Sequence, residues 1–162
     1  MMPARDDAAV AERAREPMAF FSHDSHAASD IKCRRLIRRF GMEGYGRWWL
    51  LCELLAAAEG HSLPFGDDED ALILAETLRF SGAGSFDEPI VLDECRKFVE
   101  GLVDIGLLSV TPDGGIESER MTRNAEYFGK NRANGAKGGR PKKKGSETDG
   151  CRQRKPERKP PV

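Results

Sequence analysis

Residues 134–145, NGAKGGRPKKKG, contain five basic side chains, four glycines, one proline and no acid. Cations at this density can neutralise the phosphates of a nucleic acid and release the counterions bound there. The stretch has no large apolar residue, so it cannot contribute to a core. It therefore predicts a nucleic-acid contact from five side chains, Lys137, Arg140, Lys142, Lys143 and Lys144.

Charge is divided unevenly along the 162-residue chain. Residues 120–162 carry 14 Lys+Arg and 4 Asp+Glu, a net charge of +10, whereas the preceding residues carry 12 and 23, a net charge of −11. A basic tail behind an acidic domain is typical of chains with an anionic partner, most often nucleic acid. The alternative is a tail that only keeps the domain in solution.

The sequence GGRPKKK resembles the core of an AT-hook, in which Gly-Arg-Pro lies extended in a narrow minor groove. Gly138 and Gly139 permit a close backbone approach, and Pro141 keeps the chain from becoming helical. A narrow A·T groove has an enhanced negative potential that attracts arginine, here Arg140. The arginine that usually precedes the glycine is absent, and Lys137 lies one residue further back. Minor-groove insertion and nonspecific phosphate binding therefore both remain open.

A second group of cations lies on a predicted helix over residues 29–41, SDIKCRRLIRRFG. Its apolar residues recur at i, i+3, i+4 and i+7 as Cys33, Leu36, Ile37 and Phe40. The opposite side carries Lys32, Arg34, Arg35, Arg38 and Arg39. These cations could contact DNA, or they could form a solvated face or pair with the surplus acids of the domain. Three further candidates precede the tail, namely Arg123, Lys130 and Arg132.

Other chemistry has weaker support. His23 and His26 flank Asp24, but no second cluster with ligand spacing completes a metal site. The chain lacks the common phosphate-loop, metalloprotease and nucleophile-elbow motifs, so we expect no enzyme and no cofactor.

Four scattered cysteines without a C-x-x-C pair indicate free thiols in a reducing cytosol. The most apolar stretch, residues 48–58, is too short to span a bilayer, so we expect a soluble cytoplasmic protein with no membrane partner.

The remaining elements follow from hydrophobic spacing and turn residues. Helices are predicted over residues 43–60, 67–80 and 91–106, with an extended HSLPF segment after the first of them. Two short extended runs, 107–111 and 115–120, flank Pro112-Asp113-Gly114-Gly115 and predict a β-hairpin. A short helix over 121–133 should pack back on the domain.

Helices followed by a hairpin predict a mainly α fold with a small β-hairpin, arranged as a winged-helix domain. We expect a disordered arm or frayed helix over residues 1–18, the winged helix over 19–120, the C-terminal helix over 121–133 and a disordered basic tail over 134–162. The expected core is Phe40, Trp48, Leu51, Leu55, Leu72, Leu78, Phe98, Leu102 and Leu107.

Residues 19–142 resemble the N-terminal winged-helix domain of phage and prophage replication proteins, which is similar to that of DnaD-type replisome organisers. The matching positions are Phe21, His23, Asp24, Lys32, Arg34, Leu36, Phe40, Gly41, Gly44, Leu51, Cys52, Glu53, Asp68, Glu69, Asp70, Leu74, Ala75, Glu76, Gly106 and Leu107. The resemblance implies a role in replication initiation or replisome organisation, with DNA and a partner such as a helicase loader.

The helix that would enter the major groove in a winged-helix protein is acidic here. Between Leu92 and Ile105 four acids oppose Arg96 and Lys97, and the hairpin adds further acids. Phosphates would repel such a surface, so we expect DNA contacts from the tail and the helix at residues 29–41 instead. The alternative is a protein-interaction adaptor or transcriptional regulator that uses the acidic surface, including contacts with a second copy of itself.

Overall fold

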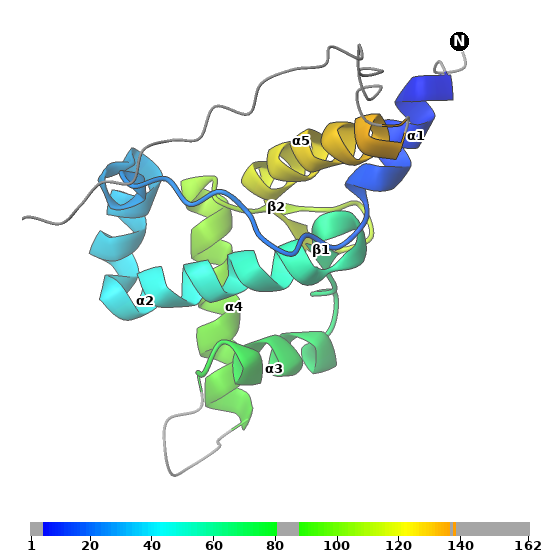
Figure 1. The fold of residues 1–162 in the computed structure, drawn as a ribbon. Helices are drawn as coiled ribbons and strands as arrows, with labels where there is room; N and C mark the ends of the chain where they lie inside the picture. Colours follow the sequence, from blue (N-terminus) through cyan, green and yellow to red (C-terminus); the bar gives the residue numbers. More distant parts are fainter. Residues whose placement is uncertain (1–4, 81–87, 137, 139–162) are drawn as a thin grey trace, which may run out of the picture.

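The computed structural model describes residues 5–80, 88–136 and 138. Its elements are α1 (Arg5–Ala14), α2 (Ile31–Ala57), β1 (Ser62–Leu63), α3 (Asp68–Thr77), α4 (Glu88–Ile105), β2 (Ser109–Val110), β3 (Ile116–Glu117) and α5 (Glu119–Ala136). The structure is mainly helical with one small antiparallel sheet, as predicted (Figure 1).

Helix α2 consists of two segments that meet at Gly41, where φ is 68° and ψ is −169°. Glycine adopts a positive φ without the steric cost that a Cβ would add. Asp30 caps the first segment, because its carboxylate accepts bonds from the backbone N–H groups of Lys32 and Cys33. The prediction that the first helical run ends at Gly41 is confirmed.

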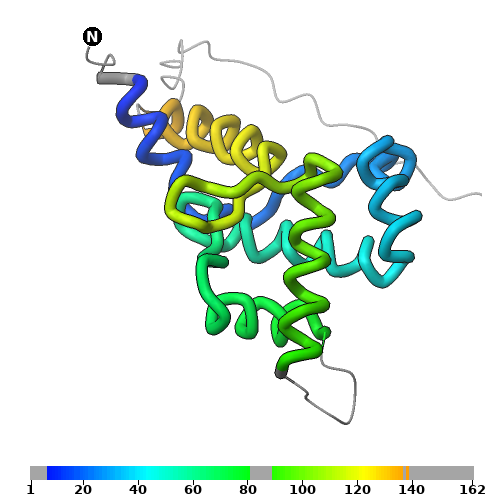
Figure 2. Tube along the Cα trace, turned by 180° about the vertical axis from the view of Figure 1, so that it is seen from behind, coloured from blue at the N-terminus to red at the C-terminus, as the bar shows by residue number. Residues whose placement is uncertain are grey.

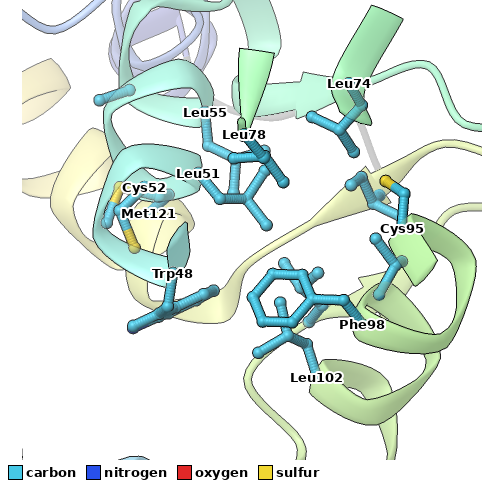
Figure 3. Packing of buried hydrophobic residues seen from close by; sticks show 14 of the residues in the cluster. Trp48, Leu51, Cys52, Leu55, Leu74, Leu78, Cys95, Phe98, Leu102 and Met121 are labelled. Carbon is cyan, nitrogen blue, oxygen red and sulfur yellow. The ribbon is translucent and has the colours of Figure 1, made fainter. Parts of the chain in front are cut away.

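The core lies between the second segment of α2 and the helices α3 and α4 (Figure 3). Trp48, Leu51 and Leu55 on α2 meet Phe98 and Leu102 on α4, and all five are at most 1% exposed. Cys52 and Cys95 are buried free thiols in the same core, and burial raises the pKa of each to about 12. They stay uncharged and pack as small apolar residues.

Several predicted core positions are less buried than expected. Phe40 and Leu107 are only partly buried against the core, and the neighbouring Leu108 is buried instead. On α3, Leu74 takes the buried position that was assigned to Leu72. On a short helix, or near the end of a helix, the spacing of apolar residues does not determine which of several neighbouring ones is buried.

The three short strands form a sheet in the order β1-β3-β2. Strand β3 pairs antiparallel with both neighbours, and Glu117 lies opposite Ser62 on one side and Ser109 on the other. The β2–β3 hairpin turns at Gly114, whose φ is 86°. The predicted hairpin is therefore confirmed. The extended HSLPF segment contains β1, which is the third strand of the sheet.

Helix α5 begins directly after β3 and lies along the rest of the domain (Figure 2). Its Met121 and Ala125 side chains are buried in the hydrophobic core. It extends further than the predicted helix at 121–133, to Ala136. Residues 137 and 139–162, which include most of the predicted tail, lie outside the described residues.

Of the two expectations for residues 1–18, a disordered arm or a frayed helix, the structure has a helix, α1, over Arg5–Ala14. It lies beside α5 in both views (Figures 1 and 2). Small residues allow this approach: a Cβ added at Gly129 would lie 2.8 Å from both the backbone nitrogen and the Cβ of Ala14. The sequence did not reveal the packing of this helix on α5, because the contacts use small side chains and backbone rather than a stripe of large apolar residues.

Hydrogen bonds to backbone carbonyls hold the end of α1 in place. The His61 ring is buried, with Nε2 2.9 Å from the Ala14 carbonyl and Nδ1 3.0 Å from the Leu55 carbonyl. The Arg132 guanidinium donates to the carbonyls of Arg13, Glu16 and Pro17. These bonds tie the chain before α2 to both α2 and α5.

Replacing Trp48 with Ala should lower the free energy of unfolding by about 3–5 kcal/mol, the range for a large aromatic side chain removed from a core. Chemical denaturation of both proteins measures the difference. Small domains are stable by only about 5–15 kcal/mol, so much of the variant could be unfolded at 37 °C. A melting curve equal to that of the wild type would contradict the buried position.

Replacing Gly129 with Ala should displace α1, because the added methyl group meets the backbone of Ala14. Hydrogen–deuterium exchange should then rise in residues 5–14 and change little in the second segment of α2. Gly135→Ala is the matched control, since it lies on the same helix with nothing within 4 Å of the added Cβ. Equal exchange in the two variants would show that the close approach does not hold α1.

Candidate nucleic-acid interface

Two of the five cations on the first segment of α2 hold the fold together. Lys32 donates from Nζ to the carbonyl oxygen of Gly106 at 2.6 Å, where α4 ends. Arg39 pairs with Asp104 at 3.0 Å, and its guanidinium lies 5.2 Å from the centroid of the Phe40 ring. Both side chains therefore bind α4 or its end, which leaves them less free to bind phosphate.

The other three cations, Arg34, Arg35 and Arg38, are exposed. Over the part of the chain that the structure describes, none of their side chains makes an ion pair or a hydrogen bond. A phosphate could bind these guanidinium groups without breaking an existing contact. The predicted basic surface on α2 is thus reduced to three arginines.

The exposed side of α4 is acidic, as predicted. Asp93, Glu94, Glu100 and Asp104 are exposed, and the two cations of this helix are already paired. Arg96 pairs with Asp68, and Lys97 pairs with Asp93. Helix α4 therefore offers a phosphate backbone little positive charge.

The hairpin tip carries a carboxylate that favours its charged form. The Thr111 hydroxyl donates to Asp113, and this bond lowers the pKa of that carboxyl. Asp113 is therefore ionised at neutral pH. A negative charge at the tip opposes insertion of the hairpin along a phosphate backbone.

The cations on α5 have different surroundings. Arg123 is exposed and lies 3.9 Å from the Glu119 carboxylate, and Lys130 is exposed. Arg132 lies against the backbone before α2 and also pairs with Glu16 at 3.4 Å, so its contacts are structural. The tail cations Lys137, Arg140, Lys142, Lys143 and Lys144 lie outside the described residues.

Sequence reasoning missed a cluster around Trp49. The His23 ring stacks on Trp49 with centroids 3.8 Å apart, and the Arg120 guanidinium lies 5.4 Å from the Trp49 centroid. Arg120 also donates from Nη2 to the Ser22 carbonyl at 2.6 Å. The cluster holds residues 22–23 against α2 and α5. The sequence signal for this cluster was the Phe-x-His-Asp segment. Its packing role could not be predicted, because the contact depends on Arg120, which lies 97 positions after His23 in the sequence.

A pocket of about 220 Å³ lies beside this cluster, between α2 and the start of α5. Its charged lining residues are Asp24, Asp30, Lys32, Glu119, Arg120 and Arg123. Equal numbers of acids and bases give the pocket no clear preference for an anion or a cation. Among the described residues no three His, Cys, Asp or Glu side chains gather as a metal site would require.

None of the helices over residues 5–80 and 88–136 combines the length and the apolar character needed to cross a bilayer.

Comparison with known proteins identifies a family for this chain. Neither a curated protein nor a solved structure matches the chain. The model of the family described as Lin1244/Lin1753-like, N-terminal, matches residues 20–111. That region begins just before the His23–Trp49 contact and runs through α2, α3, α4 and β2. Because the match covers more than half of the sequence, the chain belongs to the Lin1244/Lin1753-like N-terminal family.

Proposed function

We propose that this chain is a non-catalytic, cytoplasmic DNA-binding protein of phage- or prophage-type DNA replication. The observation that carries the proposal is the separation of charge along the sequence. Residues 1–119, the acidic body, have a net charge of −11, and residues 120–162 have a net charge of +10. A solubilising tail would not require cations to be concentrated this strongly beside glycines and a proline. Release of counterions from DNA phosphates gives such a segment a direct source of affinity.

The order of elements supports a winged-helix domain. From α2 onward the chain runs helix, strand, helix, helix and hairpin, and the first strand, β1, pairs with β3. In that arrangement α4 occupies the position of a recognition helix and the β2–β3 hairpin that of the wing. The resemblance of residues 19–142 to replication proteins of this fold suggests the process in which the domain acts.

The charges of the described residues favour an unusual DNA contact. The recognition helix of a winged-helix protein normally lies in the major groove. The exposed side of α4, which would face that groove, carries acids. Arg34, Arg35 and Arg38 on α2 and the basic tail are better suited to phosphates. Contacts of this kind position a protein on DNA without reading its sequence.

The acidic exposed side of α4 favours a second candidate function. It could bind a basic surface of another protein, such as a helicase loader or a transcription factor, or of a second copy of this chain. The domain would then act as an adaptor or regulator, and the tail would bring it to DNA. Removal of the tail separates the two functions, since an adaptor would keep its protein partner when DNA binding is lost.

The first test replaces Lys137, Arg140, Lys142, Lys143 and Lys144 with Ala. Each lost phosphate contact removes about 0.9 from the slope of log K against log salt, so the slope on duplex DNA should flatten by up to about 4. The matched control replaces Arg152, Arg154, Lys155, Arg158 and Lys159, which changes the net charge by the same amount. An unchanged slope in the first variant would rule out the GGRPKKK stretch as a DNA contact.

The Arg140→Lys variant distinguishes phosphate contact from AT-hook-like insertion into the minor groove. Lysine keeps the charge but is more strongly hydrated, so it gives up its water less readily in a narrow groove. If Arg140 enters a minor groove, the variant should lose more affinity for A·T-rich than for G·C-rich duplex. Equal losses on both duplexes would favour phosphate contact.

A second test replaces Arg34, Arg35 and Arg38 with Ala. The slope should flatten by about 2 to 3 if all three bind phosphates. The melting temperature should stay close to that of the wild type, because the three side chains make no ion pair or hydrogen bond within the described residues. Full DNA affinity and slope in this variant would confine the contact to the tail.

A further inference from the structure

Two aromatic side chains of the described residues project into solvent. Phe20 is 68% exposed and Tyr127 is 62% exposed, whereas the other described Phe, Tyr and Trp side chains are buried or half-buried. Trp48 is 1% exposed and belongs to the core, as expected from the sequence, so its ring cannot stack on a base. Large exposed rings are costly to hydrate and often mark a binding surface when they occur together.

The two exposed rings are joined by a third. Phe20 meets Phe128 edge to face with centroids 4.8 Å apart, and Tyr127 meets Phe128 with centroids 5.4 Å apart. Phe128 is itself packed against the hydrophobic core, so it anchors the row. We refer to Phe20, Phe128 and Tyr127 as the aromatic row.

The chain next to Phe20 is held in position by two bonds to α5. The Ser22 N–H donates to Asn124 Oδ1 at 3.0 Å, and the Ser22 carbonyl accepts the bond from Arg120. These bonds keep Phe20 beside α5 even though its ring is exposed. A rigid ring loses little conformational freedom when it binds a ligand, which favours its use in recognition.

Cations flank the aromatic row on the same helix. Arg123, Tyr127 and Lys130 follow at i, i+4 and i+7, so they share one face of α5. Glu126 is exposed at the edge of this face, and Glu119 lies 3.9 Å from Arg123. The helix ends at Ala136, and the cations of the GGRPKKK stretch follow directly in sequence. Exposed rings alternating with cations match the chemistry of unpaired nucleotides, which present a base face and a phosphate at each step.

We propose that the aromatic row is a stacking surface for the bases of single-stranded DNA, with the phosphates bound by Arg123 and Lys130. The inference rests on the proposed function and specifies the form of DNA that it engages. Bases in a duplex are stacked on each other, so their faces cannot reach Tyr127 or Phe20. Single-stranded DNA is therefore bound more tightly than duplex of equal length.

The test measures fluorescence anisotropy of a labelled dT20 oligonucleotide and of a 20-base-pair duplex with the full-length chain. Base–aromatic stacking of about 1–3 kcal/mol per base predicts that Tyr127→Ala or Phe20→Ala weakens dT20 binding about 5- to 160-fold. Duplex affinity should be unchanged. The salt slope on dT20 should also stay the same, because neither substitution removes a charge.

Two control variants separate stacking from folding and from general apolar contact. Tyr127→Phe keeps the ring and should retain dT20 affinity. Val110→Ala removes an exposed apolar side chain on β2, an element that contributes no residue to the aromatic row, and should have no effect. Thermal melting of each variant verifies that the domain stays folded.

The outcomes distinguish this inference from the proposed function. If the wild type binds neither DNA, the proposed function fails and this inference fails with it. If the wild type binds duplex and dT20 with equal affinity, and Tyr127→Ala weakens neither, the inference is overturned while the proposed function stands. If light scattering shows that Tyr127→Ala converts a dimer to a monomer with dT20 affinity unchanged, the aromatic row joins two copies of the chain and the inference is overturned.

Discussion

The bend at Gly41 is the constraint on which the arrangement of this domain depends. It allows the two helical segments of α2 to serve two purposes, since the second contributes Trp48, Leu51 and Leu55 to the core while the first presents arginines to solvent. The bend is held by close packing on both sides. A Cβ added at Gly44 would lie 2.3 Å from the Cβ of Phe40, and one added at Gly101 would lie 2.4 Å from the Cζ of Phe40. The Phe40 side chain thus fills space beside Gly44 on α2 and Gly101 on α4 that a Cβ would occupy, and its ring meets the Phe98 ring edge to face with centroids 5.2 Å apart. Lys32 and Arg39 reinforce the same contact by binding the end of α4.

Features built from large apolar residues and turn residues could be predicted from the sequence. The spacing of Trp48, Leu51 and Leu55 and the Pro-Asp-Gly-Gly turn place the central helix and the hairpin correctly, because each depends on local periodicity or backbone preference. Helix α1 could not be predicted this way. Its position depends on the contact between Gly129 and Ala14 and on carbonyl groups that bind His61 and Arg132, and small residues and backbone atoms leave no periodic signal. A winged-helix assignment goes beyond the observed mixture of helices and small sheet and remains a proposal.

The candidate interface shows a related limit. Cations can be counted in a sequence, but the sequence does not show which of them form contacts within the fold. Lys32, Arg39 and Arg132 bind carbonyls or carboxylates of distant elements, and their partners lie 74, 65 and up to 119 positions away. Their predicted role in DNA binding is weakened for that reason. The exposed arginines of α2, together with Arg123 and Lys130, remain available. Exposure also determines the role of aromatic side chains: Trp48 lies in the core, whereas Phe20 and Tyr127, which periodicity did not single out, are left at the surface.

The cations and the aromatic row would contribute to DNA binding in physically different ways. Phosphate contacts release counterions, so their contribution falls as salt rises and depends little on base pairing. Stacking requires an unpaired base but releases no counterion, so it discriminates between single and double strands at any salt concentration. The acidic body, with its net charge of −11, repels DNA beyond these contacts, and this repulsion is also weaker at high salt. Affinity would then come mainly from the tail, whereas the choice of single-stranded over duplex DNA would come from Phe20 and Tyr127. This division explains how a domain whose helix α4 is acidic could still select one form of DNA.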